Sequence, residues 1–258
     1  MERKPYIGIT GLERQEQTAS LSDSFVPLAN YDLMIGVLVS SKSAFGIPTK
    51  YPHRYPRAED VSNIFLPEQG ILNLIHYSTD ERDHLLAQMA TVSDFGYPFC
   101  NGFQLNMVWP ELRAVVSYKD FEPEHVLVLQ CGSRALSVLG IDIRELPQKK
   151  DIDILAEQII GYGDVIDYIL LDMSGGRGKL LNVPFTRAYL EGLYAKRLYP
   201  KIGIAGGLSA ETLPGVAELF REFPGLSIDA EGGLRAADDH LDLPKAIAYL
   251  RKAAQYLS

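Results

Sequence analysis

The sequence predicts a single (β/α)₈ barrel, a closed cylinder of parallel strands covered by helices. Short runs rich in β-branched and other apolar residues recur from one end of the chain to the other, and helix-like segments separate most of them. The competing architecture is an open doubly wound sheet. Its usual Gly-x-Gly-x-x-Gly turn is absent after the first run, which favours the barrel.

Eight runs are expected to form the strands. Several of them are continuous apolar stretches, as is typical of strands that are buried on both faces. In chain order they are YIGIT (6–10), LMIGVLVS (33–40), ILNLIHYS (71–78), GFQLNMV (102–108), HVLVLQC (125–131), VIDYILLD (165–172), KIGIAGG (201–207) and LSIDAEGG (226–233).

Helices are predicted from apolar stripes and from their start and stop signals. The clearest covers residues 78–96, where Thr79 or Asp80 can cap the start and Gly96 follows the end. Three more are expected: 151–163 starting at Asp151 or Asp153, 209–223 with Ser209 as N-cap, and 242–257 with Pro244 in the first turn. Residues 41–57 read as a long loop.

Length and composition favour one domain covering residues 1–258. The chain is 47% apolar, enough for one large core, and no linker or shift in composition divides it. No G-x-S-x-G elbow, H-x-x-x-H pair or C-x-x-C pair occurs. We therefore expect no metal and no cofactor.

The charge pattern restricts the partners. The net charge is −8, and no run of Lys or Arg interrupts the acidity, so nucleic acid and anionic membranes are not expected as partners. The chain has no apolar stretch of about 20 residues. Its start does not resemble a signal peptide, and two cysteines are too few for a disulfide framework. These features predict a cytoplasmic monomer or homodimer.

Two glycine pairs end the last two expected strands. Gly206–Gly207 follows KIGIA, and Gly232–Gly233 follows SIDAE. Glycine lets a ligand approach the backbone closely, and a helix that starts directly afterwards offers free N–H groups to an anion. Barrels often hold a phosphate at the ends of strands seven and eight. The pairs therefore predict a phosphate site, and the alternative is that they are only tight turns.

Several segments resemble phosphoribosylanthranilate isomerase, a barrel enzyme of tryptophan synthesis. They are YIGITGLE in the first strand, FQLNM in the fourth, LLDMSGGRGK in the sixth, GIAGGLSAETL in the seventh and SIDAEGGLR in the eighth. The resemblance implies a phosphoribosyl-type ligand whose phosphate lies at the two glycine pairs, with Gly175 and Gly176 in the loop after the sixth strand. It also implies that Asp172 matches the family's general acid and Asp229 its acidic residue on strand eight.

The chain departs from the family at six positions. The cysteine base that directly precedes GIT is replaced by Ile7, which cannot move a proton; a gain of isomerase activity in Ile7→Cys would show that the rest of the site is intact. Gly11 stands for Arg or Asn, Asn106 for the histidine of QLHG, and Arg177 for the threonine of GGTGK. Glu231 and Gly232 replace the first two residues of the phosphate turn, and the Glu231 carboxylate would repel a phosphate unless it points away or pairs with a cation.

Other strand-end residues suit chemistry or ligand binding. Asp172 and Asp229 follow apolar runs, where a carboxyl group suits a general acid, although each could equally cap a turn. Cys131 ends strand five and is a candidate substitute base, or alternatively a buried apolar side chain.

Five further side chains are candidates for holding the ligand. Gln104 and Asn106 point to the same side of strand four and can orient ligand hydroxyls, as can His76 near the end of strand three. Arg54 and Arg177 can meet an anion, or can simply be solvated.

Taken together, the sequence predicts an enzyme that isomerises a small phosphorylated sugar by acid–base chemistry. Asp172 is the expected acid, and the base is not identified. The alternative is a barrel that binds such a phosphometabolite without turning it over; a scaffold without a ligand is a third reading.

Overall fold

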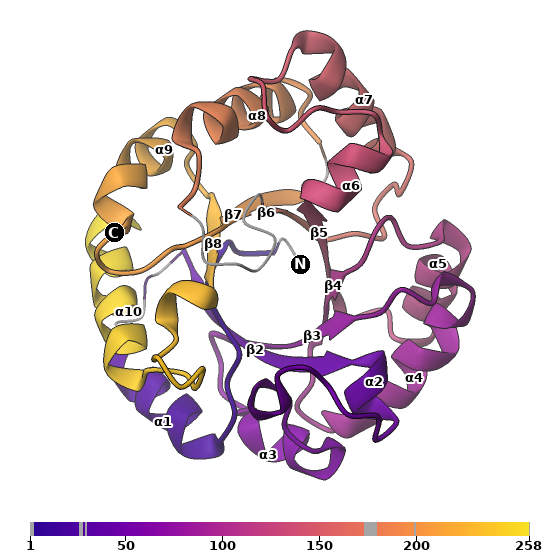
Figure 1. Cartoon of the computed structure of the whole chain (residues 1–258), viewed down its shortest axis with the longest axis vertical. Helices are drawn as coiled ribbons and strands as arrows, with labels where there is room; N and C mark the ends of the chain where they lie inside the picture. The colour runs from indigo at the N-terminus through magenta and orange to yellow at the C-terminus, as the bar shows by residue number, and fades with distance from the viewer. Residues whose placement is uncertain (1–2, 26–27, 29, 173–179, 199, 258) are drawn as a thin grey trace.

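The computed structural model describes residues 3–25, 28, 30–172, 180–198 and 200–257. The chain is a closed barrel in which each strand pairs in parallel with the next and β8 pairs with β1 (Figure 1). The strands are β1 Tyr6–Thr10, β2 Asp32–Ser40, β3 Ile71–Ser78, β4 Gly102–Asn106, β5 Val126–Gly132, β6 Tyr168–Asp172, β7 Lys201–Ala205 and β8 Ser227–Ala230. The predicted fold class is confirmed.

Helices surround the strands, and α1 and α10 lie against each other to close the outer ring (Figure 1). The α-helices are α1 Gln15–Ser24, α2 Ser41–Ala44, α3 Val61–Ile64, α4 Leu85–Phe95, α5 Leu112–Phe121, α6 Ser133–Val138, α7 Lys149–Ile160, α8 Val183–Ala195, α9 Ala217–Glu222 and α10 Leu243–Leu257. Short 3₁₀ helices are η1 Pro52–Arg54, η2 Ala58–Asp60, η3 Arg82–His84, η4 Leu213–Val216 and η5 Gly232–Leu234.

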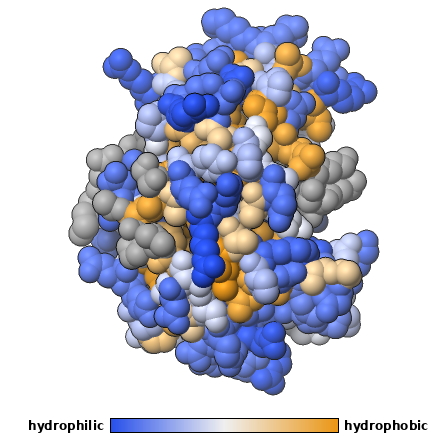
Figure 2. Space-filling model, turned by 90° about the vertical axis from the view of Figure 1, so that its left-hand side faces the viewer, coloured by the Kyte–Doolittle hydropathy of each residue, from blue (hydrophilic) through white to orange (hydrophobic). Residues whose placement is uncertain are grey.

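Alternation along the strands divides the core into two layers. The side chains on one face fill the barrel interior, and those on the other face pack beneath the helices. The apolar interior set is Tyr6, Met34, Leu72, Leu74, Val126, Val128, Tyr168, Leu170 and Ala205. Ile7 belongs to the outer layer and is fully buried there. The outside is mainly hydrophilic on the side of α9 and α10, with hydrophobic residues showing between the polar ones (Figure 2).

The helix expected from Ser209 starts later than the sequence predicts. Residues 210–212 form a turn, η4 follows, and regular α-helix begins only at Ala217. The Ser209 carbonyl accepts the N–H of Thr212, as in a turn. Pro214 and Gly215 explain the delay, because proline lacks an N–H and glycine is a weak helix former.

Two other predictions need smaller corrections. Thr79 accepts the N–H of Glu81 in a turn before η3, so it does not cap α4, which begins at Leu85. The stretch expected as a loop over 41–57 contains α2 and η1. No helix in the described part of the chain is long and apolar enough to cross a membrane.

Candidate functional site

Polar side chains meet at the end of the barrel where the strands finish. In the strand register Asp172 of β6 pairs with Ala205 of β7, which pairs in turn with Asp229 of β8. A small cavity opens at this mouth. Its lining consists of His76, Gln104, Gln130, Asp172, Ala205, Gly206, Gly207, Asp229, Glu231 and Gly232. The catalytic face of a barrel is this end of its strands.

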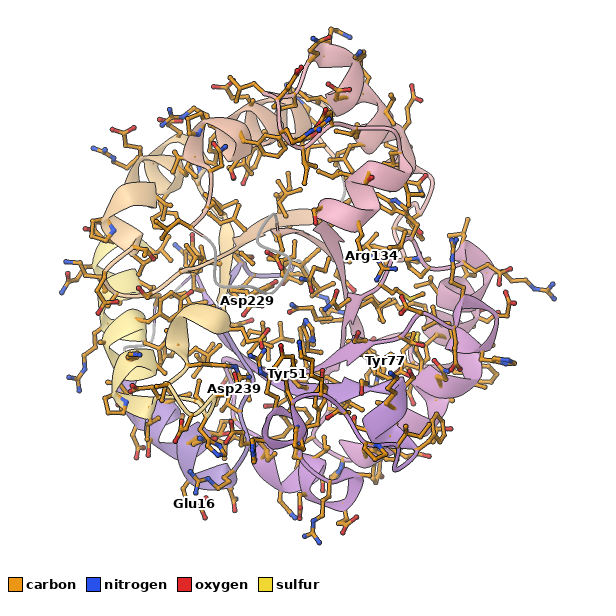
Figure 3. All side chains as sticks on the ribbon, viewed as in Figure 1. Glu16, Tyr51, Tyr77, Arg134, Asp229 and Asp239 are labelled. Carbon is orange, nitrogen blue, oxygen red and sulfur yellow. The ribbon has the colours of Figure 1, made fainter. Side chains whose placement is uncertain are left out.

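Asp229 is a buried carboxyl group with two donors. The Thr10 hydroxyl donates to it over 3.0 Å, and the Gln104 side-chain amide donates over 3.1 Å. Burial raises the pKa of Asp229 to about 6, although the bond from Gln104 and the charge of His76 act in the opposite direction. A carboxyl group with a pKa near neutrality can exchange protons under ordinary conditions. Figure 3 shows Asp229 inside the ring of strands.

Asp172 is joined to His76 through Gln130. The Gln130 side-chain Nε2 donates to Asp172 Oδ2 over 2.7 Å, and Gln130 Oε1 lies 3.1 Å from His76 Nε2. These three residues come from β6, β5 and β3, and Asp172 is only 4% exposed. The mouth therefore holds two buried carboxyl groups, each bonded to a side-chain amide.

Two buried polar atoms at the mouth have no hydrogen-bond partner among the described residues. They are His76 Nδ1 and Gln104 Oε1, and both residues line the mouth cavity. A buried polar atom normally has a partner, because leaving it without one costs about 1–3 kcal/mol. Each of these atoms therefore keeps an unused hydrogen-bonding capacity within the described part of the mouth.

The two glycine turns lie against each other. Gly206 and Gly207 have φ values of 125° and 59°, a region that side chains with a Cβ rarely adopt. A Cβ at Gly233 would lie 2.4 Å from the Leu208 carbonyl oxygen, so this glycine allows the turns to touch. The helix expected directly after Gly207 is absent. Any anion at Gly206, Gly207, Gly232 and Gly233 must therefore bind the N–H groups of these turns and of the short 3₁₀ helix η5, without the end of an α-helix behind them.

Glu231 at the mouth is paired with cations. Arg54 lies 3.2 Å from it and Arg235 lies 3.3 Å from it. Arg54 also binds Asp239 through two hydrogen bonds, one of them 2.8 Å long, and stacks on Tyr51. We call this set, which joins the loop after β2 to the loop after β8, the Arg54 bridge; two of its members, Tyr51 and Asp239, are labelled in Figure 3. The bridge supplies the cations that neutralise Glu231, which would otherwise repel a phosphate. It also engages the guanidinium of Arg54, which is therefore already paired with carboxylates.

The mouth cavity is small. It has a volume of about 30 Å³, room for about two water molecules. A sugar phosphate therefore needs the residues around the cavity to move before it can enter.

Some predicted site residues lie elsewhere. Cys131 is fully buried in the outer layer, and burial raises its thiol pKa to about 12, so it is not placed to act as a base at the mouth. Ile7 also faces the outer layer. Asn106 is exposed at the end of β4. Gly175, Gly176 and Arg177 lie outside the described residues.

Sequence reasoning overlooked Thr10 and Gln130. Alternation along the strands identifies both residues. In β5, Gln130 lies on the same face as the interior residue Val128, whereas Cys131 lies on the same face as Leu129, beneath the helices. Counting by twos along LVLQC would have selected the glutamine. Choosing the final residue of the run selected the wrong face.

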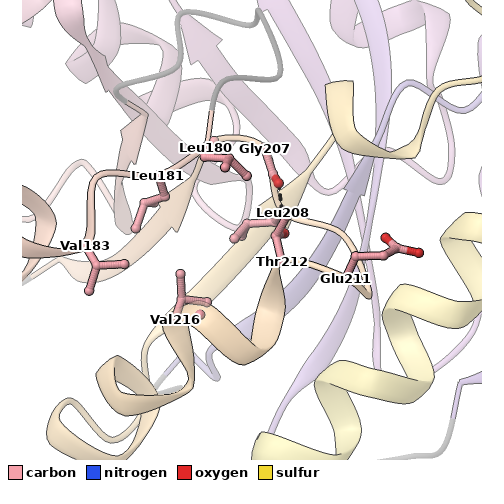
Figure 4. Close-up of a pocket in the computed structure, with 10 residues that line it drawn as sticks. Leu180, Leu181, Val183, Gly207, Leu208, Glu211, Thr212 and Val216 are labelled. Carbon is pink, nitrogen blue, oxygen red and sulfur yellow. Dashed lines mark hydrogen bonds between the residues drawn. The ribbon is translucent and has the colours of Figure 1, made fainter.

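A second pocket adjoins the first. It has a volume of about 270 Å³ and shares Gly206 and Gly207 with the mouth cavity (Figure 4). Leu181, Val183 and Val216 give it an apolar lining, and the Thr212 hydroxyl donates to the Gly207 carbonyl across its edge over 2.9 Å. The glycine turn thus separates a polar cavity from an apolar one. No group of three or more His, Cys, Asp or Glu side chains within the described ranges is arranged to hold a metal ion.

Comparisons with known proteins give matches in structure. No family model and no curated protein sequence matches the chain. N-(5'-phosphoribosyl)anthranilate isomerase from Pyrococcus furiosus superposes with a TM-score of 0.67 at 15% identity, over 97% of this chain and 99% of that one. A phosphoribosyl anthranilate isomerase in complex with reduced 1-(o-carboxyphenylamino)-1-deoxyribulose 5-phosphate gives 0.61 at 15%, over 98% and 100%.

A protein of different chemistry also matches. The catalytic domain of a hyperthermophilic chitinase from Pyrococcus furiosus gives a TM-score of 0.57 at 11% identity, over 99% of this chain and 97% of that one. At these identities the similarity concerns architecture and not activity. The chain shares its (β/α)₈ barrel fold with the phosphoribosylanthranilate isomerases over nearly its whole length.

Proposed function

We propose that this protein is an acid–base isomerase of a small phosphorylated sugar or amino sugar. The observation that carries the proposal is the mouth cavity, where the buried carboxyl groups of Asp172 and Asp229 lie beside the glycine turn at Gly206 and Gly207. Isomerisation requires a proton donor and a proton acceptor on one small substrate. A phosphate held at the turns would bring the sugar over these groups.

The charges support an anion at the turns. Backbone N–H groups in tight turns bind anions without needing a lysine or arginine. Glu231 would otherwise repel a phosphate, but Arg54 and Arg235 both lie within 3.3 Å of it. We place the phosphate at Gly206, Gly207, Gly232 and Gly233.

Asp172 is assigned the role of general acid. It lies at the strand position where the resemblance places the family's acid, and Gln130 fixes one of its oxygens. In this role its carboxyl group gives a proton to a sugar oxygen. The phosphorylated ligand found in a barrel of this architecture supports the choice of a sugar phosphate as substrate.

Binding without turnover is the competing function. Position 7 and Cys131 both face the outer layer, so neither provides a base at the mouth. Such a barrel would use the same glycine turns and would leave its ligand unchanged.

Calorimetry and turnover assays separate the two functions. Ribose 5-phosphate, ribulose 5-phosphate and phosphoribosylanthranilate are titrated beside their unphosphorylated counterparts, and each is incubated with the protein to detect isomerised product. Asp172→Asn, which keeps an acceptor for Gln130, should bind as the wild type does and lose about 10²-fold or more in turnover.

The outcomes differ clearly. Binding of phosphorylated compounds without product from any of them would favour the binding barrel. Equal affinity for phosphorylated and unphosphorylated compounds would overturn the phosphate site, and full activity of Asp172→Asn would show that the acid lies elsewhere.

A further inference from the structure

Gln130 determines where His76 carries its proton. Its Nε2 donates to Asp172, so its Oε1 faces His76 Nε2 at 3.1 Å. An amide oxygen only accepts hydrogen bonds, and the hydrogen between the two atoms therefore belongs to the imidazole. Neutral His76 is thus protonated on Nε2 and has a bare lone pair on Nδ1.

That lone pair is buried and unused among the described residues. The His76 side chain is 5% exposed and lines the mouth cavity. Its Nδ1 accepts no hydrogen bond from the described residues. The oxygens of Asp229 differ in this respect, because Thr10 and Gln104 already donate to them. His76 Nδ1 is thus a basic atom of the mouth whose lone pair accepts no hydrogen bond from the described residues.

We infer that His76 is the general base of this barrel and that Gln130 is its positioning residue. The inference rests on the proposed function, for which it supplies the missing proton acceptor. It also narrows the substrate to a sugar phosphate, or its amine adduct, with a C–H bond next to a carbonyl or imine carbon. That proton is acidic enough for an imidazole to remove.

The step balances without an added oxidant or reductant. Nδ1 takes the proton from carbon, the C–H electron pair becomes the C=C bond of an enol or enamine, and Asp172 gives its proton to the carbonyl oxygen or imine nitrogen. The former carbonyl or imine carbon then takes the proton from Nδ1, and the hydroxyl on the carbon that lost its hydrogen gives its proton to Asp172. A new carbonyl forms at that carbon, which completes a 1,2-shift.

The surroundings stabilise the imidazolium that forms. Asp229 interacts electrostatically with His76, and Gln130 Oε1 continues to accept from Nε2 while it links the ring to Asp172. The remaining charged group of the cavity lining, Glu231, is paired with Arg54 and Arg235. The added positive charge therefore shares the cavity lining with the carboxyl groups of Asp172 and Asp229.

The test follows carbon-bound protons in D₂O. Ribulose 5-phosphate is incubated with the protein, and proton NMR measures the exchange of the hydrogens next to its carbonyl. His76→Gln should slow exchange about 10²-fold or more and leave affinity for inorganic phosphate within about twofold. His84→Gln, at an exposed histidine, is the matched control and should exchange at the wild-type rate.

Two further measurements exclude a structural explanation. Added imidazole should restore part of the exchange to His76→Ala, which it cannot do for a misfolded barrel. Nitrogen-15 NMR of the wild type should show His76 protonated at Nε2 and bare at Nδ1, and Gln130→Met should remove this preference and slow exchange about tenfold or more.

The possible results separate the inference from the proposed function. Exchange by the wild type and equally by His76→Gln overturns the inference and leaves the isomerase proposal intact. A proton on Nδ1 in the nitrogen spectrum also overturns the inference. Phosphate-dependent binding of ribulose 5-phosphate without exchange overturns both proposals, as does absence of binding.

Discussion

Asp229 shows how burial changes the chemistry of one residue. Its pKa rises from 3.8 to about 6 because the barrel interior disfavours the charged form. The folded protein therefore binds this proton more tightly than the unfolded chain does. The contribution to stability is fully present below about pH 4 and is lost as the pH rises through about 6.

Removing this charge should alter the pH dependence of stability. Between pH 4 and pH 8 the wild type should lose about 2–3 kcal/mol relative to Asp229→Asn, since one pKa unit corresponds to about 1.4 kcal/mol. Urea unfolding of both proteins across this range measures the difference. Parallel curves would show that the pKa of Asp229 is not raised.

Gly233 is the residue that lets the two turns meet. Gly233→Ala should cost about 1–3 kcal/mol and weaken phosphate binding, because its Cβ would lie 2.4 Å from the Leu208 carbonyl oxygen. Gly215→Ala, where a Cβ meets nothing within 4 Å, is the control and should leave phosphate binding unchanged without lowering stability. Urea unfolding and phosphate titration test the pair, and equal behaviour of the two variants would contradict the packing role.

At the scale of the element, the face of β1 decides what position 7 can do. Ile7 pairs in register with Leu33 and Ile228, and all three belong to the outer layer. A cysteine placed at position 7 to restore the family's base would carry its thiol into this outer layer, away from the mouth.

Ile7→Cys should therefore add no isomerase or exchange activity. Its thiol should react with an aromatic disulfide reagent only after the protein unfolds, as a buried sulfur does. Rapid labelling of the folded variant, or a gain in activity above the Ile7→Ser control, would show that position 7 reaches the mouth.

At the scale of the whole molecule, the sequence predicted the strands well. Each predicted run coincides with a strand to within a few residues, because strands buried on both faces need continuous apolar stretches. Helix starts were less accurate. Ser209 looks like an N-cap, but the local effects of Pro214 and Gly215 postpone the helix.

Only part of the candidate site could be predicted, because the sequence shows where a strand ends but not which of its faces enters the barrel. Strand ends are visible in the sequence, so Asp172, Gln104 and Asp229 could be named. The choice between neighbours such as Gln130 and Cys131 depends on which face enters the barrel, and the resemblance of isolated motifs did not decide it. The partners of Arg54 depend on a contact across 177 and 185 positions of the chain, which no local pattern reports.

The Arg54 bridge makes two distant loops open together. The bridge joins the loop after β2 to the loop after β8, so neither loop can move away from the mouth without breaking the same contacts. We therefore expect the backbone amides of both loops to exchange their hydrogens as one cooperative unit. The amides of Tyr55 and Ala236, each bonded within its own loop, should exchange at similar rates.

Arg54→Gln should raise both rates together, while the Gly215 amide in η4 stays unchanged. Mass spectrometry of exchanged peptides measures this, and independent rates in the two loops would contradict it. The proposed sugar-phosphate substrate does not fit the closed cavity, so it can enter only when the mouth opens, and we expect the joint opening of these two loops to admit it.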